Sequence, residues 1–146
     1  MISQQEYARM KEEVSPVSDK KRNALKAFLI GGAICAAGQV LLSALAMLGA
    51  DRDAASAWTS VLLISAGALA TGLGWYSTLA KHGGAGTLIP ITGFSNAVCS
   101  AAVEAQSEGL IFGVGTKIFT IAGPVILYGT AASVICGFVY YLTGLV

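Results

Sequence analysis

Four ionisable side chains in the second half of the sequence are its first candidates for chemistry. They are His82, Glu104, Glu108 and Lys117. Glu104 and Glu108 are four residues apart, so a helix would place both carboxylates on one face, where they repel each other when charged. Such a pair at a pore mouth could meet a cation, or could pair with Lys117 if a glycine break turned that lysine toward it. The alternative is that both carboxylates lie in water at a membrane interface.

Two short patterns resemble parts of enzyme sites, and neither is complete. Residues 93–96, Gly-Phe-Ser-Asn, resemble the serine region of an intramembrane protease, but the single histidine, His82, belongs to a different element and has no residue to orient it. Residues 83–87, Gly-Gly-Ala-Gly-Thr, lack the lysine of a phosphate-binding loop. The three cysteines form no C-x-x-C pair, which argues against a zinc site. We expect no enzyme, no catalytic residue, no cofactor and no metal.

The composition identifies a membrane protein of one domain. The chain of 146 residues is 55% hydrophobic and 12% charged, whereas a soluble domain is about a quarter charged. Its mean hydropathy is +0.70, and its net charge of +1 gives no indication of nucleic-acid binding. A helix needs roughly 20 apolar residues to cross the hydrocarbon core. Tracts without Asp, Glu, Lys or Arg cover residues 27–50, 54–80, 82–103 and 118–146.

These tracts predict an all-α membrane protein with about four transmembrane segments after a short N-terminal tail. The third segment is irregular, because Pro90 removes a hydrogen-bond donor and Gly93 weakens a helix. It is therefore either a broken span or a re-entrant half-helix, and we favour the broken span, which places both termini on one side. A break among the glycines of residues 109–115 would let the last helix start near Lys117. The predicted tail is 1–26, and the predicted spans are about 27–48, 58–80, 88–108 and 117–142.

The tail predicts the orientation. Ser3 and Glu6 fit a capping box that starts a short helix, and Ser15-Pro16 would end it. Six of the nine Lys and Arg residues precede residue 27, which by the positive-inside rule places the N-terminus in the cytoplasm and the 50–57 loop outside. The short helix is either a frayed tail or a docking element for a soluble partner or the membrane surface.

The irregular third segment could bind an anion. A helix that restarts near Gly93 would direct its N-terminal amides, worth about half a positive charge, into the membrane interior. Neighbouring neutral side chains could add hydrogen bonds, and glycines of residues 83–86 could form an anion nest at the mouth of the path. The alternative is that Pro90 and Gly93 only shape a tight helix crossing. The hypothetical pathway comprises Lys81, Gly83, Gly84, Gly86, Thr92, Gly93, Ser95, Asn96, Glu104, Glu108 and Lys117.

Three blocks of the sequence resemble the stage V sporulation protein AC family. They read LKAFLIGGAICAAGQ at residues 25–39, GGAGTLIPITGFSN at 83–96 and AAVEAQSEGLIFGVGTK at 101–117. The sister family AEb shares these blocks but lacks the long basic tail, so residues 1–26 point to AC.

This resemblance implies a spore-forming bacterium, the forespore or spore inner membrane, and a complex with other membrane and soluble proteins of the stage V sporulation A operon. It also implies movement of dipicolinic acid, with calcium, into the developing spore and out at germination. We therefore expect a membrane channel or transport subunit embedded in the lipid bilayer. A homo-oligomer is one form it could take, since we do not expect a single copy to enclose the path. The alternative is a non-conducting assembly or scaffold subunit of the same complex.

Overall fold

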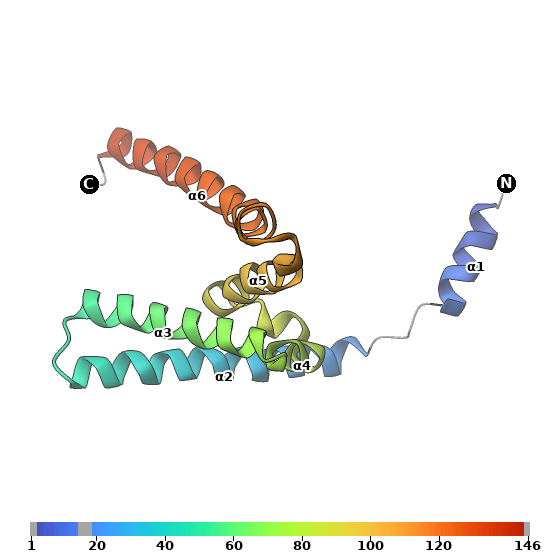
Figure 1. Cartoon of the computed structure of the whole chain (residues 1–146), viewed down its shortest axis with the longest axis horizontal. Helices are drawn as coiled ribbons and strands as arrows, with labels where there is room; N and C mark the ends of the chain where they lie inside the picture. The colour runs from blue at the N-terminus through green and yellow to red at the C-terminus, as the bar shows by residue number, and fades with distance from the viewer. Residues whose placement is uncertain (1–2, 15–18, 145–146) are drawn as a thin grey trace.

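Figure 1 shows a helical hairpin, a cluster of short helices at its open end, and one long helix that leaves the cluster obliquely. The computed structural model describes residues 3–14 and 19–144, and it contains no β-strand among them. The hairpin consists of α2, Lys20–Met47, and α3, Arg52–Gly72. Asp19 and Asp51 cap the two helices, accepting hydrogen bonds from the amides of Arg22 and Ala54 at 3.2 and 2.7 Å.

The predicted second span is divided in two. Gly74 has a φ of 75°, a left-handed conformation that glycine adopts without strain, and α3 ends just before it. The chain then turns into α4, Trp75–Gly83, which packs against α2 and α3. A 3-10 turn, η1, follows at Gly84–Thr87 and lies on α2.

The helix of the third segment begins at Pro90, three residues before the expected restart near Gly93, and it is short. The helix α5 covers Pro90–Glu104, with the proline in its first turn and the preceding Ile89 extended. Fifteen residues extend about 22 Å, less than the roughly 30 Å of a hydrocarbon core. Successive turns of α5 contact successive turns of α3, with Ser95 bonded to Ile64 and Cys99 to Ala68, so α5 packs alongside that helix in the same chain direction.

The predicted glycine break is confirmed. A 3-10 turn, η2, at Ala105–Glu108 is followed by Gly109, whose φ is 94°. A π-helical turn, η3, at Leu110–Gly115 then leads into α6, Thr116–Thr143. Within the described residues, three helical stretches are long and apolar enough to cross a membrane: Lys20–Met47, Arg52–Gly72 and Leu110–Thr143.

The long helix α6 runs back along the molecule and ends on the side of the α2–α3 turn (Figure 1). Every residue from Pro124 to Gly144 is exposed, so this half of α6 packs against nothing in the described chain. Large apolar side chains such as Tyr128 and Phe138 are 72% and 62% exposed. This pattern suits a helix that faces lipid or another subunit.

The short N-terminal helix is confirmed as α1, Gln4–Val14. Ser3 and Glu6 form the predicted capping box, with the Ser3 amide donating to the Glu6 carboxylate at 3.0 Å and the Glu6 amide donating to the Ser3 hydroxyl at 3.2 Å. The predicted stop at Ser15-Pro16 lies outside the described residues.

Candidate functional site

Two of the predicted pathway residues hold α5 against α3. The Ser95 hydroxyl is buried and donates to the Ile64 carbonyl oxygen at 2.7 Å. Asn96 lies 2.9 Å from the Thr71 hydroxyl, which also lies 2.7 Å from the Gly67 carbonyl oxygen. The Thr71 hydroxyl has one proton and can donate to only one of these groups. When the side-chain amide of Asn96 is turned to donate to the Thr71 oxygen, the hydroxyl donates to the Gly67 carbonyl oxygen. Both side chains thus serve the packing of α5 against α3, and Asn96 does not line the cavity described below.

The glycines of residues 83–86 allow the backbone of this turn to approach α2 closely. A β-carbon on Gly86 would collide with the Ala27 carbonyl of α2, and one on Gly83 would meet the Ile30 side chain at 2.9 Å. Tyr76 fixes the turn by donating its hydroxyl to the Thr87 carbonyl at 2.8 Å. Lys81 is exposed at the end of α4. An anion nest at this turn remains a hypothesis.

The acidic pair lies where the third segment ends. Glu104 is the last residue of α5 and Glu108 the last of η2, and both are exposed. Lys117 is also exposed, in the first turn of α6. No ion pair joins these three side chains, all of which lie in the described part of the chain. The same described part contains no group of three or more His, Cys, Asp or Glu side chains that could hold a metal ion.

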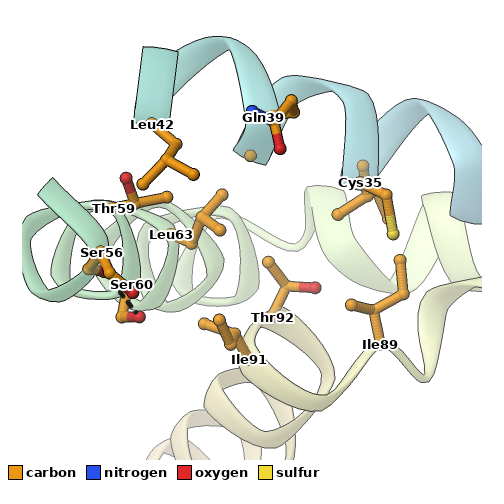
Figure 2. Close-up of a pocket in the computed structure, with 12 residues that line it drawn as sticks. Cys35, Gln39, Leu42, Ser56, Thr59, Ser60, Leu63, Ile89, Ile91 and Thr92 are labelled. Atoms are coloured by element: carbon orange, nitrogen blue, oxygen red, sulfur yellow. Dashed lines mark hydrogen bonds between the residues drawn. The ribbon is translucent and has the colours of Figure 1, made fainter. Parts of the chain in front are cut away.

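The candidate site is a cavity of about 280 Å³ between α2, α3 and the start of α5. It faces Gly38 and Gln39, near the middle of the charge-free stretch of α2, and Leu63 near the middle of α3. Figure 2 shows Thr92 and Cys35 directed into the space between α2 and α5. The full lining is Ile34, Cys35, Gly38, Gln39, Leu42, Ser56, Thr59, Ser60, Leu63, Ile89, Ile91 and Thr92.

Thr92 is the polar centre of this cavity. Its side chain is 7% exposed, and its hydroxyl oxygen is buried without a hydrogen-bond partner, the one such side-chain atom found among the described residues. The start of α5 has no side-chain cap. The amides of Ile91 and Thr92 belong to the first turn, where a helix offers no internal acceptor. The first amide that is bonded within the segment is that of Gly93, which donates to the Ile89 carbonyl oxygen at 2.8 Å.

Two other hydroxyls of the cavity are already engaged. The hydroxyls of Thr59 and Ser60 donate to the carbonyls of Ala55 and Ser56 one turn earlier, at 2.8 and 3.1 Å. The Gln39 amide donates to the Ser43 hydroxyl at 3.3 Å and keeps its second proton. No Asp, Glu, Lys or Arg lines the cavity. The site therefore offers neutral donors and a helix N-terminus, which suit a negatively charged group.

The sequence analysis found Thr92 but missed the two residues of α2 that face it, Cys35 and Gln39. Gln39 could have been found, because it is a lone amide in the middle of a charge-free span, and polar side chains in that position usually have a function. Cys35 gives no such signal, since a cysteine in an apolar span packs as a small apolar residue.

Comparisons with known proteins cover this site. Residues 23–139, which include every residue lining the cavity, match the SpoVAC/SpoVAEB sporulation membrane protein family. The chain is 42% identical over 120 residues to "Stage V sporulation protein AC" of Bacillus subtilis (strain 168), an alignment that covers 82% of this chain and 80% of that protein. No solved structure matches this chain.

Proposed function

This chain belongs to the SpoVAC/SpoVAEB family of sporulation membrane proteins, and from that premise we propose that it is a channel or transport subunit for dipicolinic acid, with calcium as the accompanying cation. The family establishes a membrane protein of sporulation. The substrate, the spore inner membrane and the use of the same path in germination are our proposal.

The observation that carries this proposal is the position of α5. Its N-terminus lies beside the middle of the α2–α3 hairpin, where an ordinary lipid-facing helix would have no reason to begin. Irregular backbone at membrane depth occurs where protein buries it or where it lines a cavity. Helices that start at mid-membrane direct their positive ends toward anions in several transporters.

The neutrality of the cavity agrees with passage of an anion. Dipicolinate is a dianion at neutral pH, and a lysine or arginine on its path would hold it tightly. Conduction requires binding that is favourable enough for entry and weak enough for exit. A helix N-terminus with one free hydroxyl supplies a modest positive potential without a full charge.

A second function is favoured by the free half of α6. Its 21 exposed residues from Pro124 to Gly144 leave a large apolar surface without a partner in the described chain, and a surface of this kind suits assembly with other membrane subunits. The chain would then be a non-conducting scaffold of the same complex.

Dipicolinate flux separates the two functions. The full chain, alone and as the complex that co-purifies with it, is reconstituted into liposomes that contain dipicolinate and a size-matched sugar. We expect release of dipicolinate and retention of the sugar. A complex that still releases dipicolinate when this chain is removed or replaced by an unrelated membrane helix would establish the non-conducting role. A complex that never releases it would refute the transport function.

Two glycines of α2 provide matched variants. A leucine at Gly38 would extend into the cavity beside Leu63, which lies 3.4 Å from the position of a β-carbon there, whereas a leucine at Gly32 would meet no atom within 4 Å. Both changes raise helix propensity equally. We expect Gly38→Leu to reduce dipicolinate flux at least tenfold and Gly32→Leu to leave it unchanged.

A further inference from the structure

We propose that the cavity between α2, α3 and the start of α5 binds the carboxylate group of a small organic acid, with the Thr92 hydroxyl and the first amides of α5 as its donors. This inference rests on the proposed function for the choice of dipicolinate as the acid to test. The binding itself does not depend on whether the acid crosses the membrane.

The unpartnered Thr92 hydroxyl is the first argument. A buried hydroxyl without a hydrogen bond is costly, and native structures seldom retain one without a reason. In a helix, threonine commonly bonds a carbonyl one turn earlier, as Thr59 and Thr71 do here. Thr92 makes no such bond and is directed into the cavity instead (Figure 2). Its proton has no acceptor in the described part of the chain.

The first turn of α5 is the second argument. Pro90 has no amide proton, so the free amides of this turn are those of Ile91 and Thr92. They lie on the same turn as the Thr92 hydroxyl. Three neutral donors at one end of a helix can serve the two oxygens of one carboxylate, which together offer about four lone-pair sites.

The rest of the lining decides the class of ligand. Beyond these donors, α2, α3 and the start of α5 all contribute apolar side chains to the lining, which are Ile34, Leu42, Leu63, Ile89 and Ile91. An inorganic anion would leave these side chains uncovered, whereas an organic acid would place its ring or chain against them. The volume of about 280 Å³ is close to the lower end of the roughly 300–1,000 Å³ of small-molecule sites. The site therefore fits a small acid with an apolar body.

The native cysteines offer a direct measurement. Both Cys35 and Cys136 are exposed; Cys35 lines the cavity, whereas Cys136 lies on α6, outside the set of residues that line it. The full chain in detergent is treated with a small methanethiosulfonate reagent, and the modification rate of each cysteine is read by mass spectrometry. We expect dipicolinate to slow the modification of Cys35 and leave that of Cys136 unchanged. The neutral dimethyl ester of dipicolinate and inorganic phosphate should both protect Cys35 far less.

Two variants of Thr92 test the assigned donor. Thr92→Val keeps the shape and removes the hydroxyl, and we expect it to raise the dipicolinate concentration for half-protection by about 10- to 100-fold, the usual effect of losing a hydrogen bond to a charged group. Thr92→Ser keeps the hydroxyl and should stay within a few-fold of the unmodified chain. Equilibrium dialysis of dipicolinate against the same three proteins gives the binding constant without any cysteine reaction.

Each outcome decides the proposal. Protection by the ester equal to that by dipicolinate would mean that the cavity takes any apolar molecule, and the carboxylate site would be wrong. Equal binding by the unmodified chain and Thr92→Val would also overturn it. Binding that follows this pattern in a protein without dipicolinate flux would retain the site and refute only the transport function.

Discussion

Thr92 and Ser95, one turn apart on α5, contribute oppositely to stability. The Ser95 hydroxyl donates to the Ile64 carbonyl oxygen of α3, whereas the Thr92 hydroxyl is buried without a partner. Ser95→Ala should therefore destabilise the fold by about 0.6 kcal/mol, the average for hydrogen bonds between membrane helices, and by at most about 1.7 kcal/mol. Thr92→Val should stabilise it by about 1 kcal/mol, because a methyl group replaces an unsatisfied polar one. Thermal unfolding in detergent measures both, and a loss of stability in Thr92→Val would show that its hydroxyl has a partner in the protein.

Gly86 permits the contact between η1 and α2, and adding one methyl group at this position tests that role. The added carbon of Gly86→Ala would overlap the Ala27 carbonyl, a backbone atom that cannot turn away. We expect a loss of about 1–3 kcal/mol, as for other overpacked sites. The control is Gly32→Ala on α2, where nothing lies within 4 Å and the change should be neutral or stabilising by up to about 1 kcal/mol. Equal stability of the two variants would show that the contact does not require a glycine. The anion nest would then be the remaining explanation for these glycines.

The sequence identified the chemistry of these residues but not their partners. Thr92, Ser95 and Asn96 are all short neutral donors beside a predicted break, and nothing in their types tells which of them will meet α3. That depends on which face of α5 packs along α3, which is fixed by contacts between residues 25 to 31 positions apart. The glycines of residues 83–86 were likewise visible as a cluster, while the helix they approach was not.

Elements with local signals were predictable. The capping box of α1 and the glycine break before α6 follow from residue types a few positions apart, and the structure confirms both. The division of the second span at Gly74 was missed, because Leu73, Trp75 and Tyr76 continue the apolar tract on both sides of it. Membrane helices tolerate isolated glycines, so one glycine in an apolar run does not indicate a turn.

The direction of the long helices favours a re-entrant third segment over the broken span that the sequence favoured. Figure 1 shows the α5–α6 connection on the side where α4 lies, and the end of α6 on the side of the α2–α3 turn. A re-entrant α5 would leave three crossings and place eight of the nine Lys and Arg residues in the cytoplasm, with only Arg52 outside. A fully crossing α5 would move Lys117 outside as well, against the positive-inside rule.

Cysteine labelling decides between these topologies. In a background without the native cysteines, we expect Ser56→Cys to react with an impermeant thiol reagent from outside, since it lies in the predicted 50–57 loop, which the positive-inside rule predicts to face outward. We expect Ser107→Cys, exposed in η2, to react only after the membrane is permeabilised. Reaction of Ser107→Cys in intact cells would establish the four-span topology. Reaction of Ser56→Cys only after permeabilisation would reverse the orientation of the whole chain.

The whole molecule has a packed body around the cavity and one helix that projects from it. Gly129, Ser133 and Gly137 form a line of small residues on the exposed half of α6, and no atom of the described chain lies within 4 Å of a β-carbon at either glycine. If a neighbouring subunit packs there, a double Gly129→Leu and Gly137→Leu variant should lower the yield of the co-purified complex several-fold. The control is Ala131→Leu on the opposite face of α6. Equal yields would mean that lipid covers this line.

The most direct test of transport through the cavity uses spores. The chain is introduced into a spore-forming host in place of the host's own family member, in unmodified form and as Gly38→Leu or Gly32→Leu. We predict normal dipicolinate content with the unmodified chain and Gly32→Leu, and spores depleted at least tenfold with Gly38→Leu, although membranes contain equal amounts of all three proteins. Normal dipicolinate in Gly38→Leu spores would contradict the account, because a leucine that occupies the cavity would then leave the path of the anion open.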